Sequence, residues 1–256
     1  MITRESNGEN LVSKLGRAVQ MTLGALSLFP LMFLRSRSRR ETVQQMYVAG
    51  IRTLPLMTIV SLFTGMILAL QVGLELSRYS QEVFIGSAVM VSLLREMGPF
   101  MTGIVMAACV GSAMAAQLGT MTVNDEIAAL EMMTISPIRF LMAPRMAAMV
   151  VMLPLLSFYA CAVGVLGGGI VGATQLALPW DQYIGNAMLF ARDRDLWVGL
   201  FKALIFGILI TGISCYQGFV TTQGAVGVGR TTRKSVIYSL LAILISGYMV
   251  TRLFYE

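Results

Sequence analysis

A chain of 256 residues that is 56% hydrophobic and only 12% charged has too few charged side chains to cover a soluble domain of its size. Its net charge of +6 could indicate a nucleic-acid partner, but the basic residues cluster beside an apolar N-terminal segment. We therefore expect anionic phospholipid headgroups as their partner, and no nucleic acid.

The first predicted element is an amphipathic helix over residues 10–34 that lies in the membrane interface. Its apolar residues recur at helical spacing, and Lys14 and Arg17 fall among the polar positions. A signal peptide is disfavoured, because arginines follow where a cleavage site of small residues should stand. A basic linker is expected up to about residue 45, so residues 1–45 and 46–256 form the two predicted regions.

Five tracts without any charged residue follow along the chain. Four exceed the roughly 20 apolar residues that a helix needs to cross a bilayer, and the last one, with 17, is near the lower limit. They lack the alternation of a barrel strand, and only helices or closed barrels satisfy the backbone in hydrocarbon. The sequence therefore predicts an all-α integral membrane protein. Its expected spans are residues 53–74, 83–123, 146–172, 198–218 and 235–252.

The distribution of basic residues predicts how these spans are oriented. If the N-terminus is cytoplasmic, the cytoplasmic segments hold thirteen Lys and Arg residues and the outer segments hold five. The positive-inside rule then places the N-terminus in the cytoplasm and the C-terminus outside. Five spans without an internal repeat argue against a self-sufficient transporter built from inverted repeats, and favour a half-transporter that a second copy completes.

The sequence offers no catalytic, cofactor or metal site. It contains no histidine, and its three cysteines lie inside uncharged tracts without metal-ligand spacing. Gly167, Gly169 and Gly172 match a dinucleotide fingerprint, but they lie within a predicted span. The same stretch is better interpreted as Gly164, Gly168 and Gly172, small residues at every fourth position that let helices pack closely. Residues 229–235 resemble a phosphate loop, but Arg233 stands where a Walker motif needs glycine. An intramembrane enzyme is therefore the weakest reading.

Arg95 and Glu96 are the most informative charges, because they lie within the second predicted span. Ionisable side chains at such positions usually face a cavity or a partner. The alternative is that both sit at the outer membrane interface. Adjacent residues of a helix point about 100° apart, so we do not expect the two to pair only with each other.

The cytoplasmic stretch 124–137 predicts a short helix between two spans. Asn124 is a candidate N-cap, acidic residues fill the first turn, Ile127 and Leu130 share one face, and Pro137 is expected to end the helix. Such a helix could lie on the membrane or insert into the groove of a cytoplasmic partner. Its acidic character favours the partner.

Several motifs, in order and at matching spacing between residues 45 and 252, resemble the MlaE (YrbE-type) family of ABC transporter permeases. They are Leu-Arg-Glu-Met-Gly-Pro at 94–99, Val-Gly-Ser-Ala-Met-Ala-Ala-Gln-Leu-Gly-Thr-Met at 110–121, Glu-Met-Met at 131–133 with Pro137, Pro-Arg at 144–145, and Gly-Ala-Val-Gly-Val-Gly-Arg at 224–230. The chain departs from the family pattern at Ala108 and Cys109, where Gly-Arg is usual, at Gln117, where Glu is usual, and at Asp125 and Ala128.

The resemblance implies a homodimeric permease in a bacterial inner membrane, without an ATP site of its own. Its implied partners are a second copy, a cytoplasmic ABC ATPase dimer, a periplasmic ring of Mce-domain proteins, a possible small cytoplasmic regulator, and phospholipid. The implied lipid site comprises Leu68, Gln71, Leu76, Tyr79, Arg95 and Glu96. The implied ATPase-coupling residues are Asp125, Glu126, Ile127, Leu130 and Glu131, and the last cytoplasmic loop would carry Arg230, Arg233 and Lys234. A membrane scaffold that anchors an ATPase or regulator without transporting anything is the alternative.

Overall fold

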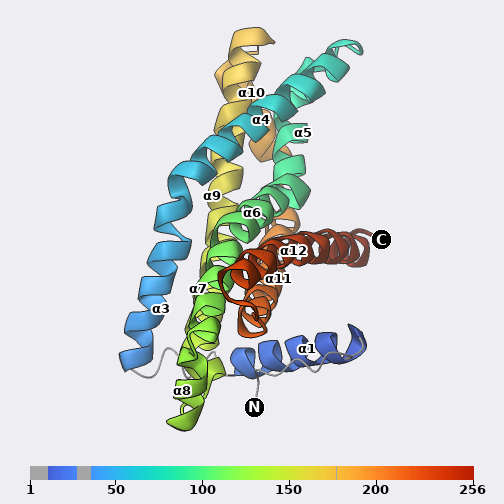
Figure 1. Cartoon of the computed structure of the whole chain (residues 1–256). Helices are drawn as coiled ribbons and strands as arrows, with labels where there is room; N and C mark the ends of the chain where they lie inside the picture. Colours follow the sequence, from blue (N-terminus) through green and yellow to red (C-terminus); the bar gives the residue numbers. More distant parts are fainter. Residues whose placement is uncertain (1–10, 28–35, 177) are drawn as a thin grey trace. The chain divides into compact units, whose positions relative to one another are not determined.

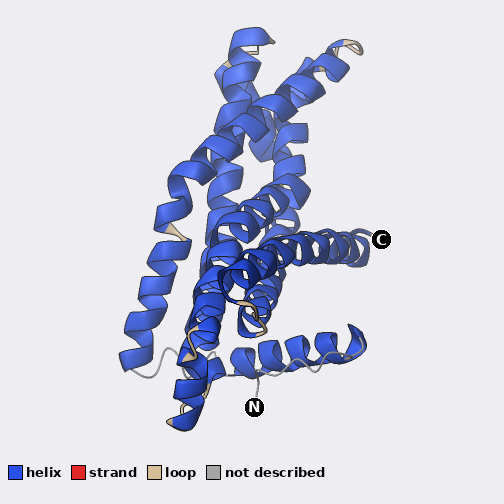
Figure 2. Ribbon diagram, in the orientation of Figure 1, coloured by secondary structure: helices blue, strands red, loops and turns tan. Residues whose placement is uncertain are grey.

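A computed structural model describes residues 11–27, 36–176 and 178–256, with side chains from residue 16 onwards in the first segment and from 39 in the second. Every regular element in these residues is a helix (Figure 2). The predicted helix at 10–34 is found as α1, Leu11–Ser27, and its remaining residues, 10 and 28–34, lie outside the described residues. The all-helical prediction is confirmed for the described part of the chain.

Within the residues that the structure describes, five helices are long and apolar enough to cross a membrane (Figure 1). They span Arg39–Ser77, Glu82–Val123, Ile138–Gln175, Asp193–Phe219 and Gly224–Tyr255. Each contains one of the five predicted spans, and the first helix extends further than predicted at its N-terminal side. The number and order of the spans are therefore as the uncharged tracts predict.

Several spans are built from more than one element. The first comprises α3 (Ser36–Ala49), a 3-10 turn (Ile51–Thr53) and α4 (Leu54–Ser77). The second comprises a 3-10 turn (Glu82–Phe84), α5 (Ile85–Ser92), a π-turn (Leu93–Met97), α6 (Gly98–Met106), a second π-turn (Ala107–Gly111) and α7 (Ser112–Val123). The short α8 (Glu126–Met132) and a third π-turn (Ile138–Met142) precede α9 (Ala143–Gln175). The last elements are α10 (Trp180–Phe190), α11 (Asp193–Phe219) and α12 (Gly224–Tyr255).

Two predicted connections are helical in the structure. The expected basic linker before residue 45 is helical from Ser36, because the stretch up to Ala49 contains neither glycine nor proline. The expected loop at 230–234 lies inside α12, which starts at Gly224. Positive φ angles at Gln223 and Gly224 place the turn there instead, and glycine adopts such an angle without steric cost.

The described residues form two compact units, each assembled from three stretches of sequence. The first lies within Met1–Arg52, Ile104–Met152 and Leu204–Ile245, and the second within Thr53–Gly103, Leu153–Ala203 and Ser246–Glu256. Each unit has its own core.

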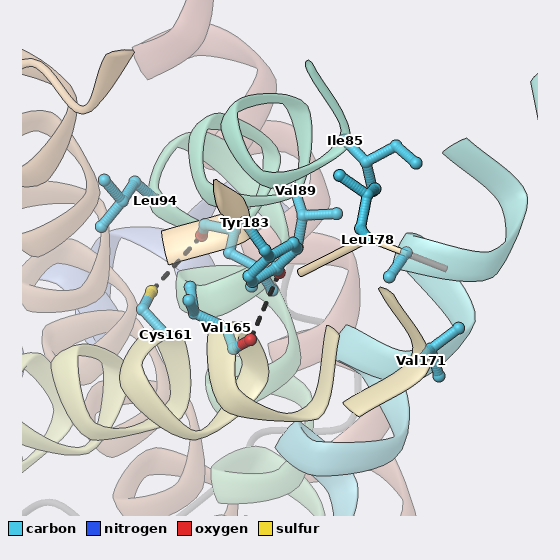
Figure 3. Close-up of a cluster of buried hydrophobic side chains, with 10 residues drawn as sticks. Ile85, Val89, Leu94, Cys161, Val165, Val171, Leu178 and Tyr183 are labelled. Carbon is cyan, nitrogen blue, oxygen red and sulfur yellow. Dashed lines mark hydrogen bonds between the residues drawn. The ribbon is translucent and has the colours of Figure 1, made fainter. Parts of the chain in front are cut away.

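The core of the second unit is formed where α4, α5, α9 and α10 meet (Figure 3). Tyr183 of α10 lies fully buried in it beside Val89, and its hydroxyl donates to the carbonyl oxygen of Val165 at 3.2 Å. Burial raises the pKa of the Tyr183 phenol, so this hydroxyl keeps the proton that it donates. The core therefore fixes α10 against the C-terminal half of α9.

The glycine pattern expected to pack helices does so within this unit. A Cβ atom on Gly65 of α4 would lie 1.8 Å from the carbonyl oxygen of Gly164 on α9, and one on Gly167 would lie 2.4 Å from that of Leu62. The backbones of α4 and α9 thus approach so closely that only glycine fits.

The core of the first unit buries one face of α1 and one face of α8. Met21 and Ala25 of α1 and Ile127 of α8 pack with Met142, Met146 and Phe219. On the other face of α1, Val19 and Leu23 are exposed. This helix is therefore apolar on two sides.

Candidate functional site

The π-turn Leu93–Met97 is the starting point of the candidate site. In a regular helix the carbonyl oxygen of Arg95 would accept from the backbone N–H of residue 99, but that residue is Pro99, which has none. The turn is wider than an α-helical one, and the N–H of Gly98 bonds to Leu93 instead. The carbonyl of Arg95 is therefore available to another donor.

The side chain of Lys202 donates a hydrogen bond to this carbonyl oxygen. Its Nζ lies 2.8 Å from the carbonyl oxygen of Arg95, 2.6 Å from Oε1 of Glu96 and 2.7 Å from Oγ1 of Thr251. These are as many acceptors as an ammonium group has protons. The Thr251 hydroxyl in turn donates to Glu96 Oε1 at 2.6 Å. Lys202 is 1% exposed, and Glu96 keeps 44% of its side chain exposed.

Arg95 makes a second cluster with different partners. Its Nε and Nη2 donate to the two carboxylate oxygens of Asp195, at 2.8 and 3.1 Å, and the Tyr255 hydroxyl donates to Oδ1 of Asp195 at 2.7 Å. The guanidinium carbon lies 4.7 Å from the centre of the Tyr255 ring. Asp195 is buried, whereas 37% of the Arg95 side chain is exposed. A charge pair with additional hydrogen bonds is the arrangement that lets ionised groups persist in a membrane span.

The two clusters are stacked by the registers of α11 and α12. Asp195 and Lys202 are seven residues apart on α11, and Thr251 and Tyr255 are four apart on α12, so each pair lies on one helix face. Arg95 and Glu96, which point in different directions, each meet one member of each pair. The expectation that they do not pair only with each other agrees with this geometry.

The sequence interpretation missed Asp195, Lys202, Thr251 and Tyr255. It counted Lys202 with an outer segment, 181–202, although this residue also falls just inside the fourth expected span, 198–218. The helix begins at Asp193, since Asp193 and Asp195 in its first turn suit the positive end of the helix dipole. The seven-residue spacing of Asp195 and Lys202 was the available signal.

The other predicted lipid-site residues lie on α4 or just after it. Leu68 and Leu76 pack against the core of the second unit. Gln71 and Tyr79 are exposed. Arg95 and Glu96 instead contact α11 and α12, so the predicted set divides into an apolar group and a charged group.

The predicted coupling residues around α8 differ in how far their side chains are exposed. Ile127 is fully buried in the core of the first unit, which contradicts its expected place on a partner-facing surface. Asp125 and Glu126 are exposed, and Leu130 and Glu131 are half-buried. The most exposed large apolar side chains of this segment are Met132, at 86%, and Met133.

The bounds of α8 also differ from the prediction. Asp125, with φ of 59°, occupies the N-cap position expected for Asn124. Thr134, also at φ of 59°, follows the last turn, so that the helix ends before Pro137. Pro137 instead begins the next helical turn, where a residue without an N–H is tolerated.

Arg230, Arg233 and Lys234 are exposed on the first turns of α12 rather than in a loop. The opposite face of these turns is buried, and its side chains carry hydroxyl groups that form hydrogen bonds. Thr231 and Thr221 of the preceding helix connection are hydrogen-bonded at 3.0 Å, and Ser235 donates to Ser214 at 2.9 Å. This pairing fixes the rotation of α12 and so directs the three basic side chains outward.

Gln117, one of the departures from the family pattern, faces a buried arginine. Its Oε1 is 3.4 Å from Nη2 of Arg145, whose Nη1 donates to the carbonyl oxygen of Leu141 at 3.2 Å. Arg145 is buried, so a neutral amide here supplies only a weak partner to a cation.

Comparison with known proteins identifies the family. Residues 42–253 match the model of the family described as Permease MlaE. A probable ABC transporter permease protein of Rickettsia prowazekii is 34% identical over 252 residues, which cover 96% of this chain and 97% of the relative. The intermembrane phospholipid transport system permease protein MlaE of Haemophilus influenzae is 32% identical over 251 residues, 94% of this chain and 92% of the relative. The chloroplastic protein TRIGALACTOSYLDIACYLGLYCEROL 1 of Arabidopsis thaliana is 32% identical over 217 residues, 85% of this chain and 62% of the relative.

The match to the family model covers the five apolar helices found in the described residues, except for two or three residues at the outermost ends, and it includes both charge clusters apart from Tyr255. Two relatives above 30% identity align over nearly their whole length. The chain is an integral membrane protein that belongs to the MlaE family of ABC transporter permeases.

Proposed function

We propose that this chain is the membrane-spanning permease subunit of an ABC-type phospholipid transporter. It would move lipid between the inner membrane of a Gram-negative-type bacterium and a periplasmic Mce-domain carrier, while partner subunits hydrolyse ATP. The observation that carries the proposal is the near full-length similarity to the Haemophilus influenzae permease, whose name specifies intermembrane phospholipid transport. The paired charges inside the spans support it, because ionisable groups there generally mark a substrate path.

The proposed assembly has two copies of the chain, a cytoplasmic ATPase dimer and a periplasmic Mce-domain ring, and it leaves room for a small cytoplasmic regulator. Residues 1–45 would form an interfacial region and 46–256 the permease domain. The exposed Val19 and Leu23 on α1 support an interfacial position, because they lie opposite the buried Met21 and Ala25.

The proposed lipid site retains the apolar and charged groups described above. Leu68 and Leu76 would contact acyl chains, with Gln71 and the exposed Tyr79 near the outer end of α4. Arg95 and Glu96 would act on the headgroup through the parts of their side chains that stay exposed. A headgroup phosphate cannot take the bidentate position on Arg95 without displacing Asp195.

The proposed contact with the ATPase is the segment 124–137. Because Ile127 is engaged in the core of the first unit, we assign the apolar part of this contact to Met132 and Met133, together with Leu130. Flexible methionine side chains suit a groove in a partner protein. Asp125, Glu126 and Glu131 would provide its polar rim, and Arg230, Arg233 and Lys234 a second cytoplasmic contact.

A photocrosslinking experiment on the assembled complex tests transport against scaffolding. A photoreactive amino acid at Leu76 or Tyr79 should capture phospholipid, and the yield should change when ATP is added. The same amino acid at Phe158, an exposed position on α9, serves as the control for bulk bilayer lipid. In a complex shown to hydrolyse ATP, yields at Leu76 and Tyr79 that match the control and ignore ATP would favour the scaffold.

A further inference from the structure

Arg194, at the start of α11, is a cation that neither the lipid site nor the coupling site uses. Its guanidinium carbon lies 5.8 Å from the centre of the Tyr255 ring, the same ring that Arg95 approaches to 4.7 Å. Arg194 is exposed, and its Nη2 donates to the backbone carbonyl of Phe254. Two guanidinium groups therefore meet around one aromatic ring near the end of α12.

The charges around this ring are not balanced. Asp195 is committed to Arg95 through both of its oxygens. Among the residues that the structure describes, Arg194 has no carboxylate within ion-pair distance, in contrast to the nearby Arg252, whose Nε is 2.7 Å from Glu256 Oε2. The exposed Arg192 adds a further positive charge to the field at Asp195, against the exposed Asp193.

Both guanidinium groups keep donors for a ligand. Arg95 uses Nε and Nη2 for Asp195, and Arg194 uses Nη2 for Phe254, so Nη1 of Arg95 and Nε and Nη1 of Arg194 make no hydrogen bond within the described residues. The forked, uncommitted N–H groups of a guanidinium match the spacing of phosphate oxygens, which a point-charge ammonium group does not. The Tyr255 ring limits where the two groups can move.

We infer that Arg194 and the free edge of Arg95, arranged around Tyr255, form a binding subsite for a phosphate group. The inference rests on the proposed function, since it gives the charged half of the lipid site a second cation. The shared chemistry is the negatively charged oxygens of a phosphate group, which a phospholipid headgroup or free inorganic phosphate could supply. Arg194 would bind the anion without any need to break the Arg95–Asp195 pair.

Binding is measured on the full-length chain in a nonionic detergent, without ATP or partner proteins. Trp197 is exposed three residues after Arg194, on the same side of α11, and reports on the subsite in a Trp180→Phe background. The probes are short-chain dihexanoyl phosphatidylglycerol, dihexanoylglycerol, which lacks the phosphate, and inorganic phosphate.

A saturable response to phosphatidylglycerol that dihexanoylglycerol does not give supports the subsite if Arg194→Gln weakens binding roughly tenfold and the matched Arg252→Gln does not. An equal response to inorganic phosphate with the same dependence on Arg194 supports the subsite with free phosphate as its ligand. The inference is overturned if no probe gives a saturable response, if dihexanoylglycerol binds as well as the phospholipid, or if the two glutamine variants bind alike.

Should Arg194→Gln fail to fold, Arg194→Lys is the second variant, because it keeps the charge but loses the forked donors. It should weaken binding about threefold. Unchanged affinity overturns the inference. These failures would leave the ATP-dependent crosslinking result untouched.

Discussion

The buried ammonium group of Lys202 determines what a substitution at Glu96 tests. Holding a charge away from water costs several kcal/mol unless partners compensate for the lost hydration. Lys202 has three acceptors, and Glu96 is the charged one. Removing this carboxylate therefore changes the stability of the permease as well as any role of Glu96 in lipid transport.

We predict that Glu96→Ala lowers stability by about 2 kcal/mol, because it leaves Lys202 without its counter-charge, while Glu96→Gln costs less because it keeps a hydrogen-bond acceptor. Thermal unfolding in detergent measures both variants. The double variant Glu96→Gln/Lys202→Met should recover most of the loss. If the double variant is less stable than either single variant, the pair is not the cause. In transport assays, Glu96→Gln at normal protein level is the variant that should still lower lipid transport.

The importance of Arg95 and Glu96 was predictable from their place in an uncharged stretch of sequence. Their partners were not, because Asp195 and Lys202 lie 100 or more residues away and α11 begins earlier than its hydropathy indicates. Pro99 explains why the carbonyl oxygen of Arg95 lacks its usual backbone donor. Which side chain donates to it instead depends on how α11 packs against the second span.

Among the elements, α8 separates residues that stabilise the permease from residues available to a partner. A helix of seven residues has little stability alone, so the buried Ile127 must fix it to the rest of its unit. The exposed Met132 and Met133 follow on its last turn and beyond. Helical periodicity identifies the Ile127 face but cannot show whether the permease or a partner covers it.

We predict opposite phenotypes for the two positions. Met132→Asp should leave thermal stability unchanged and reduce the recovery of the ATPase in co-purification, because losing an apolar anchor costs about 2 kcal/mol of binding, roughly a thirtyfold loss of affinity. Ile127→Ala should destabilise the permease itself by about 2–4 kcal/mol through a buried cavity. Undiminished ATPase recovery with Met132→Asp would move the contact to the basic face of Arg230, Arg233 and Lys234.

The contact between α4 and α9 is tested by adding one methyl group. Gly65→Ala would place a Cβ atom 1.8 Å from the carbonyl oxygen of Gly164, so the helices must separate, and we predict a loss of about 1–3 kcal/mol. The control is Gly185→Ala on α10, where nothing lies within 4 Å and alanine should add up to about 1 kcal/mol of helix stability. Equal unfolding temperatures for the two variants would contradict the close approach.

For the whole molecule, the distribution of charge and apolar residues gave the number, order and approximate limits of the membrane helices. It could not give the early starts of α11 and α12, because charged residues enter both helices. In α11, Asp195 pairs with Arg95 and Lys202 pairs with Glu96. In α12, the charged residues lie at an exposed end of the helix: Arg230, Arg233 and Lys234. The same charges determine the predicted orientation. The basic residues on the first turns of α12 stay on the predicted cytoplasmic side whether they form a loop or a helix.

We therefore predict that the segment before Pro137 is cytoplasmic and that the end of α12 is periplasmic. Single cysteines at Ser136 and Glu256, both exposed, are introduced after Cys109, Cys161 and Cys215 are changed to alanine. A thiol reagent that cannot cross the inner membrane should label position 256 in intact cells, and position 136 only after that membrane is permeabilised. Replacing Glu256 removes just a surface ion pair with Arg252, which contributes little to stability. Labelling at 136 but not at 256 in intact cells would invert the orientation, and would place the proposed phosphate subsite around Arg194 on the cytoplasmic side.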